Sequence, residues 1–307
     1  MNAAAVSDVQ TLKQRIVEFV RDASMEISPL DEKNLPELVE QLAPGTVVYI
    51  AHTPKSSVQE LARIACKVQD AGFKACMHIV ARRIPSESEL RAALKQLREA
   101  GCDRVLLVAG DLNPPAGPYT STLDVIDSGI ITDSGFRIAG FAGHPEGNPN
   151  ISPDEIWKAL EAKQAFADRS GINVYLATQF SFNARAVIDW SRQLRERGIR
   201  LPVHVGLAGP TPMDKLIKYA VLCGISASLK AAVTNPGLIA NLAKAAQGVD
   251  QVMTALVRDR TDADRASLIK PHFFAFGGSV ATARWIRAVR DGTFDMNTDG
   301  SGFAVRN

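Results

Sequence analysis

The sequence predicts a single (β/α)8 barrel. Short apolar runs alternate with amphipathic segments along the whole chain, and 307 residues suit one large barrel or two smaller domains. The apolar runs lack strict alternation, which is typical of parallel strands covered by helices. An open, doubly wound sheet is the rival fold. No predicted strand precedes G-x-G-x-x-G or G-x-x-x-x-G-K, and this favours the barrel.

Eight runs rich in Val, Ile, Leu and aromatic residues are the predicted strands: Ala23–Ile27, Thr46–Ala51, Lys74–Val80, Arg104–Ala109, Arg137–Ala142, Asn173–Thr178, Pro202–Leu207 and Pro271–Phe276. Segments with apolar residues three and four apart are the predicted helices: Val9–Arg21, Leu35–Leu42, Ser57–Ala71, Ser86–Glu99, Pro153–Ser170, Ala184–Arg197, Pro212–Leu222 and Val280–Asp291.

The region Gly224–Lys270 has a mostly helical pattern and is longer than one barrel connection needs. It predicts extra helices before the last strand. We place residues 1–307 in one catalytic domain and expect residues 1–7 to be disordered.

Composition excludes several classes of protein. The chain is 46% hydrophobic, and its 35 basic and 33 acidic residues give a net charge of +2, which argues against a nucleic-acid or membrane surface. No run approaches the roughly 18 apolar residues of a membrane span, and no signal peptide is evident. None of the four cysteines forms a C-x-x-C pair. We expect free thiols in a reducing cytoplasm.

Ionisable and amide side chains gather where the predicted strands end, which is where barrels carry their chemistry. Glu26 lies in an otherwise apolar strand. Burial would raise its pKa and suit it to be a general acid, with a structural ion pair as the alternative. Asp111 follows Gly110 and either binds a ligand or caps a turn. Gln179 would match the edge of a heteroaromatic ligand.

The loop Gly143–Asn150 combines two prolines with two glycines, so it is stiff at some positions and permissive at others. It presents His144, Glu146 and Asn148 together.

The remaining histidines leave alternatives open. His52 and His78 suit ligand contact and a structural role equally, whereas His204 and His272 lie earlier in their strands and indicate packed core histidines. The chain has no H-x-H on the first strand and no H-E-x-x-H, so we expect no catalytic metal.

Four motifs, taken together, resemble the methylenetetrahydrofolate reductase family: Ser24–Pro29, Leu106–Asp111, His144–Pro149 and Thr178–Asn183. They occur in the family's order and at roughly its spacing. The resemblance implies a (β/α)8 barrel that binds FAD and uses NAD(P)H to reduce 5,10-methylenetetrahydrofolate to 5-methyltetrahydrofolate.

The resemblance also implies roles for individual residues. Glu26 matches the general acid, which helps protonate N10 of the folate, and Asp111 matches the aspartate beside the pterin and the flavin. Gln179, with Phe180 next to it, matches the substrate contact. The cofactor contacts implied are His52, His78, Gly110, Asp111, His144, Glu146, Asn148 and Lys163.

The departures from the family pattern fall on flavin and folate-tail contacts. Ala109 stands where the family has an arginine, His144 where it has a tyrosine, and Asn148 where it has a histidine. Ala51 stands where the family has a threonine. The segment 272–278 lacks the Asn-Arg pair that the family has at the last strand. We therefore expect altered cofactor handling: FAD held by different contacts, or direct hydride delivery from reduced nicotinamide. The reaction is also compatible with the oxidative direction in one-carbon catabolism.

Two alternatives remain open at this point. One is a folate- or pterin-binding barrel without redox activity, and the other is a metal-dependent or aldolase-like lyase barrel. A homo-oligomer formed through the outer helices is compatible with the fold.

Overall fold

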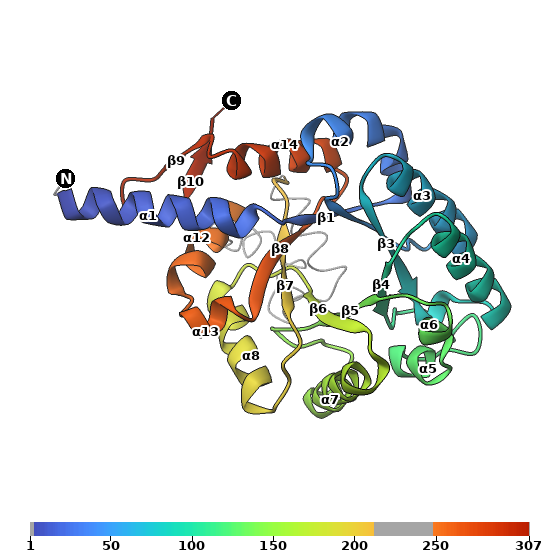
Figure 1. Cartoon of the computed structure of the whole chain (residues 1–307). Coiled ribbons are helices and arrows are strands. Elements are labelled where there is room, and N and C mark those ends of the chain that lie inside the picture. Colours follow the sequence, from blue (N-terminus) through green and yellow to red (C-terminus); the bar gives the residue numbers. More distant parts are fainter. Residues whose placement is uncertain (1–2, 212–247, 307) are drawn as a thin grey trace, which may run out of the picture.

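Eight parallel strands close into a barrel in the computed structural model, which describes residues 3–211 and 248–306 (Figure 1). The strands follow one another in chain order, and β8 pairs with β1 to close the barrel. The predicted (β/α)8 fold is confirmed. The strands are β1 Ser24–Ile27, β2 Val47–Ile50, β3 Lys74–Val80, β4 Arg104–Val108, β5 Ile138–Gly143, β6 Asn173–Thr178, β7 Val203–Ala208 and β8 Leu268–Phe274.

Helices surround the barrel (Figure 1). Those described are α1 Ala3–Val20, α2 Leu35–Gln41, α3 Val58–Asp70, α4 Glu87–Glu99, α5 Thr122–Asp127, α6 Ile130–Asp133, α7 Pro153–Ser170, α8 Ala184–Glu196, α12 Val249–Asp259, α13 Asp262–Arg265 and α14 Ser279–Arg290. The 3-10 helices η1 Pro29–Asn34 and η2 Ala81–Arg83 follow β1 and β3, and a hairpin of β9 Phe294–Met296 and β10 Phe303–Val305 follows α14. Within these residues, no helix has both the length and the apolar character needed to cross a membrane.

Helices α12 and α13 confirm that extra helices precede the last strand. The predicted helix Pro212–Leu222 and Cys223 lie outside the described residues. The disorder expected for residues 1–7 stays a prediction. Helices α5 and α6 were not predicted, because each is too short to show an apolar period.

Side-chain caps set where the helices begin, and so where each strand's exit loop ends. Ser57, Ser86 and Asn183 each accept a hydrogen bond from a backbone N–H in the first turn of α3, α4 and α8. At α7, Ser152 and Glu155 cap each other's backbone groups reciprocally. Because the caps fix the first residue of each helix, they also fix where the preceding strand-to-helix loop ends. These loops together form one rim of the barrel.

Two apolar layers hold the barrel. The outer layer packs strand residues such as Met25 and Ile50 against the helices. The inner layer fills the barrel with Tyr49, Cys76, Leu106 and Tyr175, among others. Gly140 on β5 is required here, because a Cβ at this position would lie 2.4 Å from the Tyr175 ring.

Candidate active site

Glu26 on β1 faces the interior of the barrel, where two imidazoles flank its carboxyl. Its neighbours Met25 and Ile27 point the other way, into the outer apolar layer. Glu26 Oε2 lies 3.3 Å from Nε2 of His78 on β3 and 4.0 Å from Nε2 of His272 on β8. The predicted general acid therefore lies between two histidines from neighbouring and closing strands.

Burial decides the protonation of this group. It raises the pKa of Glu26 to about 8 and lowers the pKa values of His78 and His272 to about 3 each. Near neutral pH the carboxyl is therefore protonated and both imidazoles are neutral. About 18% of the Glu26 side chain remains exposed. A protonated carboxyl and neutral imidazoles form no ion pair, and the role of Glu26 as a general acid stays a prediction.

The ring nitrogens of His78 and His272 differ in whether they have hydrogen-bond partners. Nδ1 of His272 lies 3.1 Å from Ser24 Oγ. Nε2 of His272 and Nε2 of His78 are buried and have no hydrogen-bond partner among the described residues. Buried polar atoms usually have partners, and the polar group nearest to each of these two nitrogens is the carboxyl of Glu26. His272 is buried as predicted, but its contact with the acid was not.

His52 follows β2 and lies beside the same group. Its Nε2 is 3.1 Å from the Ser56 carbonyl oxygen, while its Nδ1 is buried without a partner in the described part of the chain. Burial lowers the pKa of His52 to about 4, so this imidazole is also neutral.

Asp111 lies away from this buried group, in the loop after β4. Its side chain is 83% exposed and its Oδ1 is 2.9 Å from Arg83 Nη2. Gly110 has φ +86°, and a Cβ there would lie 2.3 Å from Val80 Cγ1, so only glycine fits. Arg82 donates to the carbonyl oxygens of Leu112 and Thr120 and holds this loop.

The loop after β5 pairs its own polar groups. The exposed Glu146 accepts a 2.5 Å hydrogen bond from Ser181 Oγ, which ties the loop to the exit of β6. Asn148 Oδ1 accepts from the backbone N–H of Asn150 at 2.9 Å. These two predicted cofactor contacts therefore help to set the shape of the loop.

His144 and Lys163 form a basic pair behind this loop. Lys163 on α7 is buried and donates from Nζ to the Ala142 carbonyl oxygen at 3.3 Å. Burial lowers the pKa of Lys163 to about 8, and burial together with Lys163 lowers the pKa of His144 to about 4. Lys163 makes no ion pair with any described residue.

Gln179 and Phe180 follow β6. The backbone N–H of Gln179 donates to the Gly143 carbonyl oxygen at 2.9 Å, and its side chain is partly buried. Phe180 is 1% exposed and packs edge-on against Phe276 at 4.8 Å between ring centroids, with Phe274 at 5.6 Å. Phe180 thus lies within an aromatic cluster below the surface of the mouth.

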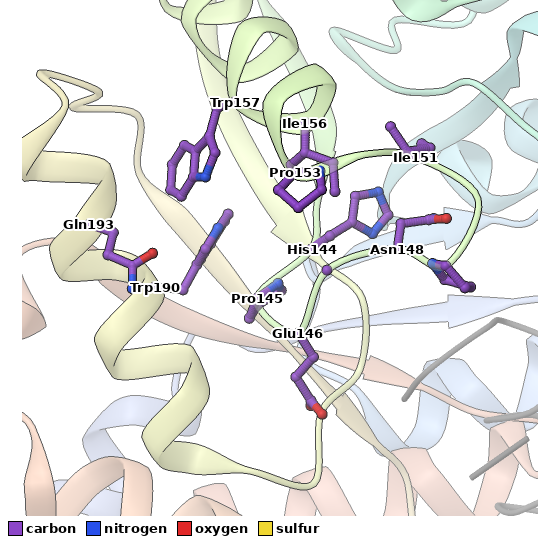
Figure 2. A pocket seen from close by; sticks show the side chains of 12 residues that line it. His144, Pro145, Glu146, Asn148, Ile151, Pro153, Ile156, Trp157, Trp190 and Gln193 are labelled. Atoms are coloured by element: carbon purple, nitrogen blue, oxygen red, sulfur yellow. The ribbon is translucent and has the colours of Figure 1, made fainter. Parts of the chain in front are cut away.

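A pocket of about 310 Å³ opens between the loop after β5 and the helices α7 and α8 (Figure 2). His144, Glu146 and Asn148 line it on the loop side. Trp157 on α7 and Trp190 on α8 line it on the helix side, as Figure 2 shows. Glu26 is not among its lining residues. Glu26 and the pocket are thus separate parts of the candidate site.

Comparison with known proteins decides the family. Residues 28–232 match the family model described as methylenetetrahydrofolate reductase. The chain belongs to the methylenetetrahydrofolate reductase family. The matched range includes Asp111, the loop after β5 and Gln179, while Glu26 lies just before it.

Two yeast members of this family are similar to the chain. Methylenetetrahydrofolate reductase 2 of Saccharomyces cerevisiae is 27% identical over 157 residues, which cover 48% of this chain and 26% of the yeast protein. Methylenetetrahydrofolate reductase 1 of Schizosaccharomyces pombe is 29% identical over 169 residues, which cover 49% of this chain and 25% of the yeast protein. The matched segments thus span about a quarter of these relatives.

Three groups around Glu26 were not predicted to lie there: Ser24, His272 and Tyr49. The first could have been found, because strand alternation places Ser24 and Glu26 on the same face. Barrel closure places β8 beside β1 and Ser24 in register with His272.

Within the described residues, no cluster of His, Cys, Asp and Glu has the geometry to hold a metal ion.

Proposed function

We propose that this protein interconverts 5,10-methylenetetrahydrofolate and 5-methyltetrahydrofolate by hydride transfer, with NAD(P)H as the electron donor in the reductive direction. The observation that carries the proposal is the largely buried carboxyl of Glu26 in a member of this family, because burial raises its pKa to about 8 and so favours the protonated acid near neutral pH. This reaction needs such an acid, because the five-membered ring of the substrate opens only when N10 accepts a proton.

The proposed step balances in atoms and electrons. Glu26 gives its proton to N10, the N10–methylene bond breaks, and the electron pair of N5 forms an iminium with the methylene carbon. A hydride from the donor then reduces that carbon to the methyl group, and NAD(P)H ends as NAD(P)+. The carboxylate left on Glu26 regains a proton from solvent. The reverse sequence oxidises 5-methyltetrahydrofolate.

The proposed pterin contacts come from two other strand ends. Gln179 offers an amide edge that can both donate to and accept from the pterin ring. Asp111 would accept from the pterin amino group, exchanging its contact with Arg83 for the ligand. An exposed ion pair of this kind is worth little, so the exchange costs little. Phe180 supports this wall from its aromatic cluster.

FAD is the cofactor we propose, and the residues present fit it. The buried ammonium of Lys163 has no carboxylate partner in the described chain and suits a phosphate. The indoles of Trp157 and Trp190 suit the flat adenine ring. His52, His78, Gly110, His144, Glu146 and Asn148 complete the proposed contacts. When bound, FAD would carry the hydride between nicotinamide and folate.

The test is the visible spectrum of the purified protein, followed by turnover in both directions. We expect the absorption bands of an oxidised flavin, which NAD(P)H bleaches and 5,10-methylenetetrahydrofolate restores. Oxidation of 5-methyltetrahydrofolate with an artificial acceptor tests the reverse direction. Absence of turnover in both directions, with added FAD and either nicotinamide, would overturn the proposal.

A folate-binding barrel without redox activity is the second candidate. The altered residues on the cofactor side, Ala51, Ala109, His144 and Asn148, favour it. Calorimetry separates the two: tight folate binding with no hydride transfer to or from any cofactor supports the binding barrel.

A further inference from the structure

Four phenylalanine rings gather at the exits of β6 and β8. Phe274 is the last residue of β8, and its ring centroid lies 5.6 Å from that of Phe180. Phe276 lies 4.8 Å from Phe180 and stacks on Phe274 at 5.9 Å. Phe182 packs edge-on against Phe180 at 5.7 Å. Phe180 is buried, whereas the other three rings are partly exposed, so the cluster presents an apolar aromatic surface at the barrel mouth.

The register of the strands places this cluster beside Glu26. Glu26 on β1 and Phe274 on β8 are Cα partners. Neighbouring strands lie about 4.8 Å apart, and side chains in register point to the same face of a sheet. The Phe274 ring also lies 4.9 Å from the imidazole of His272, whose Nε2 is 4.0 Å from Glu26 Oε2. The aromatic surface therefore begins next to Glu26 and extends away from it over the ends of β8 and β6.

Small residues on β7 allow the rings of β6 and β8 to meet. Ala208 on β7 is the Cα partner of Phe274, and Gly206 is that of His272. Neither residue carries a side chain large enough to separate the exits of the two flanking strands. Phe180, which follows β6, therefore contacts Phe274 across β7. The aromatic surface thus spans three strand ends on one side of the mouth.

Phe276 holds an unusual backbone conformation. Its φ is +46°, and it is the one non-glycine residue of the described chain with a positive φ. A bulky side chain rarely adopts this left-handed conformation, which persists where surrounding contacts hold it and which clusters at ligand-binding sites. Here the contacts with Phe180 and Phe274 hold the ring. A ring that is kept in a strained position and stays partly exposed points to a ligand that uses its free face.

The chemistry of the proposed substrate supplies such a ligand. N10 of 5,10-methylenetetrahydrofolate is bonded directly to the benzene ring of the p-aminobenzoyl group. When Glu26 gives its proton to N10, this ring lies one bond away from the reacting nitrogen. On the β3 side of Glu26 it would meet the imidazole of His78, whereas on the β8 side it meets phenyl rings. Aromatic rings pack favourably edge-on or offset, with about 4.5–7 Å between centroids.

We propose that Phe274 and Phe276 form the subsite for the benzene ring attached to N10, and that this contact places N10 against Glu26. The inference rests on the proposed function, because it takes an N-aryl pterin as the substrate. The two phenylalanines are then specificity-determining residues that select pterins with an aryl group on N10. Loss of either phenyl ring should weaken the binding of ligands that have the aryl group and spare ligands that lack it.

Two ligands that differ in the aryl group test the subsite. 5-Methyltetrahydropteroate has the pterin, N10 and the benzene ring, whereas 5,6-dimethyltetrahydropterin has the pterin alone. Anaerobic calorimetry on the full chain with FAD added gives both dissociation constants. We expect the wild type to bind the pteroate at least about tenfold more tightly, because a benzene ring is buried. Phe274→Leu and Phe276→Leu should each weaken pteroate binding about two- to tenfold, as for loss of an aromatic pair, and change pterin binding less than about twofold.

Phe136→Leu is the matched control. Phe136 is buried in the outer apolar layer before the start of β5, at the opposite end of the strands from Phe274. This variant should leave both dissociation constants unchanged. A wild type that binds the two ligands equally well overturns the subsite even if no variant folds, and so does an equal loss of affinity for both ligands in the leucine variants. In these two outcomes the pterin still binds; absence of binding by either ligand would instead overturn the proposed function together with the subsite.

Kinetics supply a second measurement. If the benzene ring positions N10 against Glu26, Phe274→Leu and Phe276→Leu should each lower kcat/KM for 5,10-methylenetetrahydrofolate about two- to tenfold. Reduction of bound flavin by NAD(P)H should keep its wild-type rate, because that half-reaction does not use the benzene ring. A wild-type kcat/KM in both variants would show that the two rings only pack against their neighbours.

Discussion

The ionisable side chains on the two sides of the barrel mouth differ in their exposure to water. On the side of β1, β3 and β8, Glu26 and His78 are largely buried and His272 is fully buried, so loss of water shifts their pKa values towards the neutral forms. On the side of β4 and β5, Asp111 and Glu146 are exposed and pair with Arg83 and Ser181. Burial can store a proton at neutral pH, whereas exposed pairs can be exchanged for a ligand at little cost.

The departures from the family pattern fall on both sides of the barrel mouth. The departures at Ala109, His144 and Asn148 lie at the ends of β4 and β5, whereas Ala51 follows β2 and the segment 272–278 lies in and after β8, on either side of β1. The acid side keeps Glu26, and its surroundings include the buried hydroxyls of Ser24 and Tyr49. We expect substitutions of Glu26 and its two flanking histidines to affect proton transfer, and those at the ends of β4 and β5 to affect binding.

The substitution Glu26→Gln is the strongest test of the difference between the two sides of the barrel mouth. The amide keeps the shape of the side chain but cannot donate a proton as an acid. We expect reduction of 5,10-methylenetetrahydrofolate to fall about 10²- to 10⁴-fold, as for loss of a general acid. Reduction of bound flavin by NAD(P)H should change less than about twofold. Stopped-flow measurement of each half-reaction checks this, and equal damage to both would make Glu26 a structural residue.

Lys163→Met tests the β5 side. If the buried ammonium binds a cofactor phosphate, its loss removes a charge-assisted hydrogen bond, and FAD affinity should fall about 10- to 100-fold. The proton-transfer step should be spared when FAD is saturating. Lys158→Met, at an exposed position on the same helix, is the control and should bind FAD normally. Equal FAD affinity in both variants would remove Lys163 from the cofactor site.

These expectations show how far the sequence alone could reach. The bounds of β3 and β6 were predicted to the residue, because their apolar runs end sharply. The position of Glu26 followed from a lone carboxylate in an apolar strand. The approach of His272 to Glu26 did not, because it depends on closure of β8 onto β1 and on their register. Nor did the exposure of Asp111, which depends on Arg82 holding the loop.

Stability should depend on pH in opposite directions for the two kinds of buried group. The pKa of Glu26 is raised from 4.5 to about 8, so the folded state binds more protons than the unfolded state in this range, and stability falls as pH rises through it. The pKa values of His78 and His272 are lowered from 6.5 to about 3, so their contribution is lost as pH falls from 6.5.

Urea unfolding of wild type and Glu26→Gln between pH 5 and pH 9 separates these contributions. The glutamine variant should lack the loss of stability towards pH 8 but keep the loss below pH 6.5. Parallel curves for the two proteins would mean that Glu26 is not protonated in the folded state.

The smallest effect on stability is expected at the exposed ion pair. Arg83→Ala and Asp111→Asn should each change the free energy of unfolding by less than about 1 kcal/mol, because the Asp111 carboxylate is largely in water. Their effects on folate binding should differ. Asp111→Asn removes a charged acceptor for the pterin amino group and should raise KM, whereas Arg83→Ala frees Asp111 for the ligand and should leave KM equal or lower. Raised KM values of similar size in both variants would mean that the pair shapes the loop and that Asp111 does not contact the pterin.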